Sequence, residues 1–218
     1  MHQERLDTVA RELLNSGAAS VIDLGCGHGE LLQNLCTHEQ FEHLIGIDID
    51  ERALASARLV LGLDLLTPNK RLAVRYGSFQ EMDSDLAGFD AAVMLETIEH
   101  INPSGLSKVE RAVFSGMRPR AVLITTPNQE YNVLHGMSPG QRRHPGHRFE
   151  WTRAQFQLWS LGVAERNDYK VSFTDLGPAD ALRGSSTQMA RFTANDASSN
   201  KTSISLDGIG NKNGNLTY

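Results

Sequence analysis

Two carboxylates and an imidazole stand close together directly after the apolar run from Phe89 to Leu95. Glu96, Glu99 and His100 occupy positions i, i+3 and i+4, so one helical turn would project all three from the same face. Neighbouring carboxylates repel each other unless a cation or a proton compensates them. The spacing after a strand that should be buried therefore indicates a divalent-metal site, with a solvated surface turn as the alternative.

A second polar cluster lies between Arg142 and Arg153. His144 or His147 is placed to supply a fourth ligand. Two carboxylates and two imidazoles with open positions suit Mg²⁺ or Mn²⁺, and composition excludes a Cys-rich zinc site. The cluster holds four arginines against one glutamate, although the whole chain has a net charge of −5. It therefore predicts a local basic surface suited to phosphate contacts.

A glycine-rich turn follows the apolar run from Ser20 to Leu24. Gly25 and Gly27 allow a ligand to approach the backbone closely, and the helix that should follow offers free N–H groups. Asp48 closes the next predicted strand, where a carboxylate accepts hydrogen bonds from both hydroxyls of a ribose. This combination predicts a nucleotide-like ligand.

The residues around the turn discriminate between ligands. A nicotinamide or flavin dinucleotide favours glycine at the position that Glu30 occupies here. Asp23, just before the turn, suits the amino group of a methionine better than a phosphate. The turn thus favours S-adenosylmethionine, with a structural turn without ligand as the alternative. Ser78, after the third strand, either contacts adenine or its ribose or belongs to a tight turn.

Alternating strands and helices must position these residues. Leu6, Val9 and Leu13 recur at helical spacing and predict a first helix that ends at Gly17. Strand–helix alternation then implies a doubly wound, mostly parallel sheet. A long loop over 128–150 is unusual inside a domain, and such loops are often functional. The predicted strands are 20–24, 43–48, 72–78, 89–95, 121–125, 169–175 and 188–193, with further helices near 31–35, 51–61, 106–117 and 152–164.

The chain's 218 residues suit one α/β domain, which we expect over 1–193. Residues 194–218 are rich in Asn, Ser, Gly and Lys without apolar periodicity, and predict a disordered tail. No apolar run approaches the ~20 residues needed to span a bilayer, and the first residues do not form a signal peptide. Cys26 and Cys36 are expected to be free thiols, so we expect a cytoplasmic protein with no membrane partner.

Three stretches resemble one family: Glu96–His100 (ETIEH), Thr125–Asn132 (TTPNQEYN) and His147–Arg153 (HRFEWTR). They are similar to the small-RNA 3′-end 2′-O-methyltransferases of the Hua-enhancer type, whose patterns are ExxEH, TTPNxEYN and H(R/K)FEWTR. Ser186–Ala190 (STQMA) also resembles the bacterial branch. The likeness extends over roughly residues 1–193.

The resemblance implies a Rossmann-like class I methyltransferase with a seven-stranded sheet. It implies methyl transfer from S-adenosylmethionine to the 2′-hydroxyl of the 3′-terminal nucleotide of RNA with a free 2′,3′-diol. Glu96, Glu99, His100 and His147 would hold a divalent metal that binds both hydroxyls of that diol. Bacterial relatives imply an RNA end-healing kinase and ligase as partners, whereas eukaryotic relatives imply protection of small silencing RNAs.

Two departures from the family pattern stand out. Gly146 replaces the acidic residue that often precedes the ligand histidine, which removes a hydrogen bond around the metal. We also expect neither the additional N-terminal domain of many bacterial members nor a separate RNA-binding module.

Several alternatives stay open at this stage. His100, His147 or a water molecule is a candidate to accept the hydroxyl proton. Tyr131 and Phe149 either stack on the terminal base or anchor the loop by packing. The rival functions are a small-molecule O-methyltransferase of the same fold and a non-catalytic RNA- or protein-binding domain that keeps S-adenosylmethionine as a structural ligand.

Overall fold

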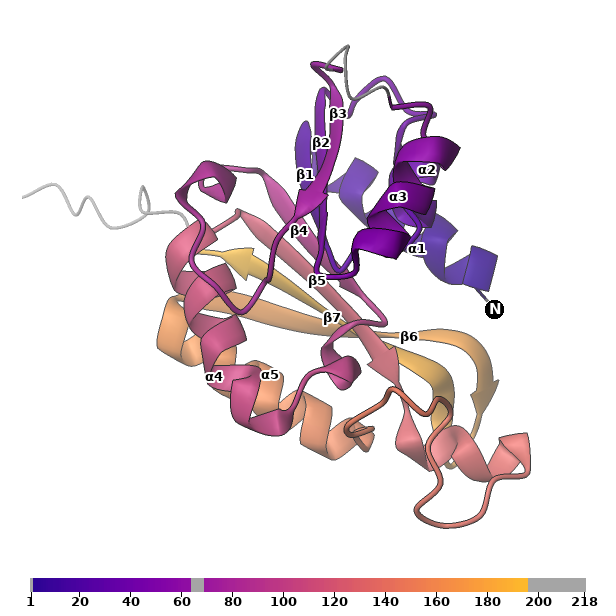
Figure 1. Ribbon diagram of the computed structural model, residues 1–218. Helices are drawn as coiled ribbons and strands as arrows, with labels where there is room; N and C mark the ends of the chain where they lie inside the picture. The colour runs from indigo at the N-terminus through magenta and orange to yellow at the C-terminus, as the bar shows by residue number, and fades with distance from the viewer. Residues whose placement is uncertain (1, 64–68, 196–218) are drawn as a thin grey trace, which may run out of the picture.

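A single seven-stranded sheet organises the molecule in the computed structural model, which describes residues 2–63 and 69–195 (Figure 1). The strand order is β3-β2-β1-β4-β5-β7-β6; the first five strands are parallel and β7 runs antiparallel to both neighbours. The predicted doubly wound, mostly parallel sheet is therefore confirmed. The strands are β1 (Ser20–Leu24), β2 (His43–Asp48), β3 (Leu72–Tyr76), β4 (Ala91–Leu95), β5 (Ala121–Pro127), β6 (Tyr169–Asp180) and β7 (Gly184–Ala194).

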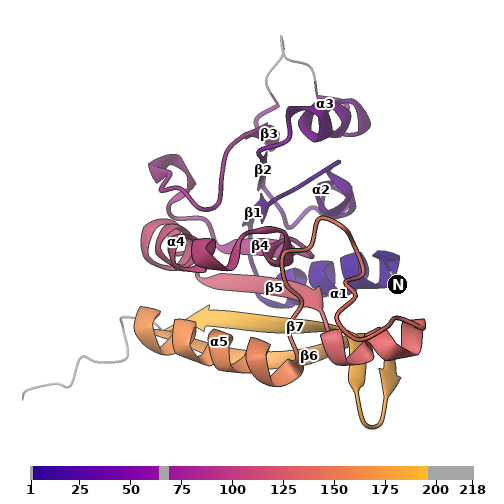
Figure 2. The same cartoon turned by 60° about the horizontal axis from the view of Figure 1, so that its bottom comes forward.

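Helices cover both faces of the sheet (Figure 2). One face carries α1 (His2–Asn15), α2 (Glu30–Leu35) and α3 (Glu51–Val60). The other carries α5 (Arg153–Asn167) and α4 (Leu106–Val109), which continues as a π-helical segment to Met117. Within the described residues, no helix is long and apolar enough to cross a membrane.

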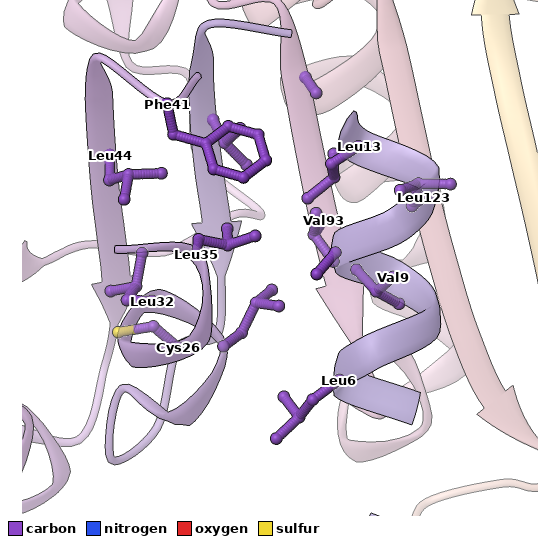
Figure 3. Close-up of a cluster of buried hydrophobic side chains, with 14 of the residues drawn as sticks. Leu6, Val9, Leu13, Cys26, Leu32, Leu35, Phe41, Leu44, Val93 and Leu123 are labelled. Carbon is purple, nitrogen blue, oxygen red and sulfur yellow. The ribbon is translucent and has the colours of Figure 1, made fainter. Parts of the chain in front are cut away.

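Alternation along the strands divides the core into two layers. On β1, Val21 packs into the layer beneath α1–α3, whereas Ile22 packs into the layer beneath α4 and α5. Leu6, Val9 and Leu13 of α1 point toward strand residues of the first layer (Figure 3). These three leucine and valine side chains are at most 4% exposed, which explains the apolar periodicity of the first helix.

The segment after β5 is more ordered than a loop. A 3₁₀-helical stretch, η5 (Gln129–His135), begins after Asn128, whose side chain accepts a hydrogen bond from the Glu130 N–H at 3.0 Å. A parallel bridge between Asn128 and Trp151 closes the base of the segment. The predicted loop over 128–150 thus lies beside the end of β5, where the parallel strands terminate.

The last two strands are longer than the apolar pattern predicts. Residues 184–187 belong to β7 although they are Gly, Ser, Ser and Thr, because they bind the loop after β5. The Ser186 carbonyl accepts hydrogen bonds from the Asn128 N–H and from Arg143. Strand β7 continues to Ala194, the first residue of the predicted tail, and residues 196–218 lie outside the described part.

Candidate active site

The glycine turn after β1 lies against the segment that follows β4. Gly25 has a φ of +83°, and a Cβ there would lie 2.3 Å from Cγ2 of Thr97, so only glycine fits. Gly27 also adopts a positive φ, and its N–H donates a 2.9 Å hydrogen bond to Oδ2 of Asp48. The turn is therefore tied to the end of β2.

A cavity of about 750 Å³ opens beside this turn. Gly25, Asp48 and Ser78 line it, together with Glu96 and His100. We call residues 96–100 the acidic segment. The Ser78 hydroxyl also accepts a 3.2 Å hydrogen bond from the Gln80 N–H, so Ser78 belongs to a tight turn, and its contact with adenine or its ribose stays a prediction. Lining residues that sequence reasoning missed are Ile49, Gly77, Phe79, Gln80, Leu95, Thr97, Ile101, Asn102 and Arg148.

Asp23 lies beneath the glycine turn rather than in the cavity wall. Its side chain is almost completely buried, at 2% exposure. Burial, and then the charge of Asp48, raise the pKa of Asp23 from 3.8 to about 7. A positively charged group that approached this carboxylate would relieve the cost of its burial.

The acidic segment does not form the continuous helical turn that its spacing suggests. Glu96 adopts a left-handed φ of +52°, and the 3₁₀ turn η2 covers only Ile98–His100. Such a conformation is strained for a non-glycine residue, by about 1–2 kcal/mol. The Glu96 N–H donates to the backbone oxygen and the hydroxyl of Thr125, at 3.2 and 3.0 Å, which holds the kink.

A second cavity, of about 500 Å³, lies between the acidic segment and the loop after β5. Glu96, Glu99, His100 and His147, the four predicted metal ligands, all line it. Potential ligand atoms of His100, His144 and His147 lie within 4.8 Å of one another, and Glu99 Oε1 is 3.9 Å from His147 Nε2. Glu96 and His100 line both cavities and so form the boundary between them.

His147 is oriented by a carboxylate that sequence reasoning did not single out. Its Nδ1 lies 2.6 Å from Oε1 of Glu150, which leaves Nε2 directed toward Glu99. Glu150 also accepts hydrogen bonds from Asn132 Nδ2 and from the Arg143 N–H. These bonds lower the pKa of Glu150 despite its burial, so the carboxylate stays charged. Carboxylate, histidine and an open nitrogen form the arrangement that presents an imidazole to a metal.

The surroundings of Glu96 and Glu99 disfavour the charged form of both carboxylates. Burial raises the pKa of Glu96, and burial and then the Glu96 charge raise that of Glu99 well above 4.5. Thr126 donates to Glu99 Oε2 at 3.0 Å and Arg5 lies 3.4 Å from Glu96. Oε1 of each carboxylate is nevertheless buried without a hydrogen-bond partner among the described residues. Two orphaned oxygens beside imidazole nitrogens fit a divalent cation.

His100 is poised to offer a neutral nitrogen. Burial, and then the nearby His147 and His144, lower the pKa of His100, and a backbone hydrogen bond with Gly146 opposes this only in part. A neutral imidazole has a lone pair free for a cation.

Arg143 and Arg153 of the predicted basic surface bond within the protein, whereas Arg142 and Arg148 are exposed, so a surface for phosphate contacts stays a prediction. Arg143 donates to Asn132, to Ser186 and to the Asn128 carbonyl, and Arg153 forms an ion pair with Glu130. These bonds fasten the loop because its backbone carbonyls need donors away from water. Arg148 is exposed and lines the larger cavity.

The two aromatic candidates for base stacking are packed. Tyr131 is 9% exposed and its ring centroid lies 5.2 Å from that of His135. Phe149 lies 4.4 Å from Trp151, between ring centroids, and packs against the core layer beneath α5. The structure therefore favours the packing alternative for both residues.

Sequence reasoning missed Glu150, Thr125 and Arg5. The spacing of His147 and Glu150 at i and i+3 was a usable signal for the first. Thr125 bonds Glu96 across neighbouring strands, and Arg5 reaches Glu96 from α1. No local pattern connects those pairs, because their partners are distant in the chain.

The sheet and the glycine turn define a Rossmann-like methyltransferase domain, a fold that supports the use of S-adenosylmethionine. A family model described as a methyltransferase domain matches residues 1–171. The crystal structure of the methyltransferase domain of bacterial CtHen1-C has 40% sequence identity and a TM-score of 0.80, covering 89% of this chain and 99% of that one. The chain therefore belongs to the Hen1 family of methyltransferase domains.

Longer relatives match as well. The small RNA 2′-O-methyltransferase of Gallus gallus is 38% identical over 185 residues, covering 81% of this chain and 48% of that protein. The crystal structure of the small RNA methyltransferase HEN1 has 30% identity and a TM-score of 0.82, covering 90% of this chain and 26% of that one. The chain spans about half the length of the curated animal relatives it matches.

Proposed function

We propose that this domain transfers a methyl group from S-adenosylmethionine to the 2′-hydroxyl of the 3′-terminal nucleotide of RNA, assisted by a divalent cation. The observation that carries the proposal is the pair of adjoining cavities that share Glu96 and His100 as their common wall. One cavity holds the predicted cofactor residues Gly25, Asp48 and Ser78, and the other holds the four predicted metal ligands. The names of the relatives, small RNA 2′-O-methyltransferases, support RNA as the acceptor.

In this proposal the larger cavity holds the methyl donor. Asp48 accepts hydrogen bonds from the two ribose hydroxyls, and the turn of Gly25 and Gly27 lets the donor approach the backbone. Asp23 balances the ammonium of the methionine moiety from beneath the turn, and Ser78 contacts adenine or its ribose. The burial of Asp23 supports this role because an approaching cation would offset its desolvation.

In the smaller cavity, Glu96, Glu99, His100 and His147 hold the cation and position both hydroxyls of the terminal diol. A divalent cation held by these residues lowers the pKa of a hydroxyl beside it and so makes the oxygen nucleophilic. The kinked Glu96 and the braced His147 keep the ligands in place before the acceptor arrives. These residues therefore act mainly by orientation.

Periodate sensitivity tests the proposed reaction. We expect the protein, given labelled S-adenosylmethionine, Mn²⁺ and a short RNA with a free 2′,3′-diol, to transfer label and to make the RNA resistant to periodate. A chelator should remove both effects. Label without resistance would place the methyl group elsewhere and contradict the proposal. Cofactor binding without any label would favour the small-molecule enzyme or the non-catalytic domain.

Glu150→Gln is expected to weaken Mn²⁺ binding by about 10–100-fold, because the neutral amide holds His147 less firmly. Either orientation of the glutamine amide places its NH₂ group against a donor, Asn132 Nδ2 at 2.6 Å or the Arg143 N–H at 2.7 Å, so stability should fall by roughly 1–3 kcal/mol. Calorimetric titration with Mn²⁺ and urea unfolding measure the two effects. Glu42→Gln, at an exposed position, is the matched control. Unchanged Mn²⁺ affinity in a folded Glu150→Gln protein would contradict the bracing role.

Association with an RNA end-healing kinase and ligase, and a cytoplasmic location, stay predictions. The one-domain boundary at residue 193 likewise stays a proposal, which limited proteolysis would test. A preferred cleavage near residues 194–200 would support it.

A further inference from the structure

Gly146 leaves room for a histidine that the four-ligand set does not include. A Cβ at position 146 would lie 2.9 Å from Nδ1 of His144 and 3.0 Å from Nδ1 of His100. Contacts this short would force the rings to shift. The glycine that departs from the family pattern therefore allows both imidazoles to approach the same point of the loop.

His144 shares the smaller cavity with the orphaned carboxylate oxygens. Its ligand atom lies within 4.8 Å of those of His100 and His147. The ring centroids of His144 and these two histidines are each 5.5 Å apart. Nδ1 of His144 accepts a 3.0 Å hydrogen bond from the Gly146 N–H, so this nitrogen carries a lone pair and no proton. In the metal-free protein that lone pair is engaged by the Gly146 N–H and Nε2 of the neutral ring carries the proton, so a cation must take the place of this one hydrogen bond.

We propose that His144 is a third imidazole ligand of the divalent cation while no acceptor is bound, and that the terminal diol of the RNA displaces it. The inference rests on the proposed function, since it deepens the account of the same metal site. It adds His144 to the four predicted ligands, and His144 can lie near them because residue 146 is a glycine.

Coordination number requires the displacement. Mn²⁺ and Mg²⁺ favour six ligands in octahedral geometry. With one ligand atom from each of Glu96, Glu99, His100 and His147, four positions would be taken, and the two hydroxyls of the diol would fill the rest. A fifth protein ligand therefore occupies a position that the acceptor needs.

The two loop histidines are held with different strength, which decides which one leaves. His147 is 7% exposed and is braced by the charged Glu150. His144 is exposed, and within the described residues its side chain makes one hydrogen bond, from the Gly146 N–H. A neutral hydrogen bond contributes only about 1 kcal/mol, so His144 can swing out while His147 stays.

Pulsed electron paramagnetic resonance of bound Mn²⁺ counts the coordinated imidazole nitrogens directly. The full chain with Mn²⁺ alone should show three. Addition of S-adenosylhomocysteine and a short RNA with a 2′,3′-diol should reduce the count to two without turnover. His144→Gln should show two in both states and bind Mn²⁺ about 10-fold more weakly without RNA. His43→Gln, exposed at the far end of β2, should match the unmodified protein.

Four results would overturn the inference. Two imidazoles in the unmodified protein without RNA would exclude His144 while leaving the proposed function intact. A count of three that persists with the diol bound would exclude displacement. A His144→Gln protein with unaltered Mn²⁺ affinity and an altered pH profile of turnover would make His144 a proton acceptor instead. Absence of any Mn²⁺ binding would remove the inference and the metal part of the proposed function together.

Discussion

Replacement of Glu99 by glutamine is expected to reduce metal-dependent turnover by on the order of a thousand-fold, because a charged ligand of the cation is lost. Cofactor binding should be unchanged, since Glu99 lines the smaller cavity and not the larger one. Glutamine keeps the shape of the side chain, and its carbonyl oxygen can still accept the hydrogen bond from Thr126. The loss would therefore be specific to the cation.

The same substitution should raise the stability of the metal-free protein. The pKa of Glu99 in the folded protein is raised well above 4.5, so the folded state disfavours the ionised carboxylate at neutral pH. Glu99→Gln removes this cost, and the metal-free variant should resist urea better than the unmodified protein at pH 7.

Turnover, calorimetry with S-adenosylmethionine, and urea unfolding with chelator test these three expectations. Glu39→Gln, at an exposed position, is the control for loss of one acidic charge. A Glu99→Gln protein that retains full turnover would refute the metal role. Lost cofactor binding would show that Glu99 instead supports the larger cavity.

Asp23 is expected to make the cofactor-free protein less stable as pH rises. Its unfolded pKa is near 3.8 and its folded pKa about 7, so only the folded state holds the proton between these values. The contribution of Asp23 to the free energy of unfolding is fully present below pH ~4. It falls between pH ~4 and ~7 and is lost above that range. The total is at most about 4 kcal/mol, at about 1.4 kcal/mol for each pH unit.

Asp23→Asn removes this dependence. In urea unfolding, the variant should gain stability over the unmodified protein at pH 8 by more than it does at pH 5.5. S-adenosylmethionine should bind the unmodified protein more tightly at pH 8 than at pH 5.5, because an ammonium partner favours the ionised carboxylate. Parallel pH profiles for the two proteins would show that Asp23 does not titrate in this range and would contradict the expectation.

The elements with strong periodicity were predictable and the polar ones were not. Leu6, Val9 and Leu13 identified α1, because a helix that buries one face repeats its apolar residues every three to four positions. The start of β7 at Gly184 carried no such signal. Its polar residues are buried because they bond the loop, a requirement that only the assembled structure imposes.

Local spacing by itself indicated the candidate chemistry of both ends of the site. Gly25 follows one strand that the apolar pattern predicts and Asp48 ends another, and the carboxyl ends of parallel strands meet at one edge. Glu96, Glu99 and His100 lie within five residues, so any compact backbone brings them near each other. Their types and order were enough to name the candidate ligands.

Only the tertiary structure decided how those groups are held. The left-handed Glu96 depends on a hydroxyl from the neighbouring strand, and His147 reaches the acidic segment only after the loop folds back. His144 approaches them because Gly146 has no side chain. Such arrangements depend on packing between segments distant in the chain, and hydrophobic periodicity carries information only about the face that each segment buries.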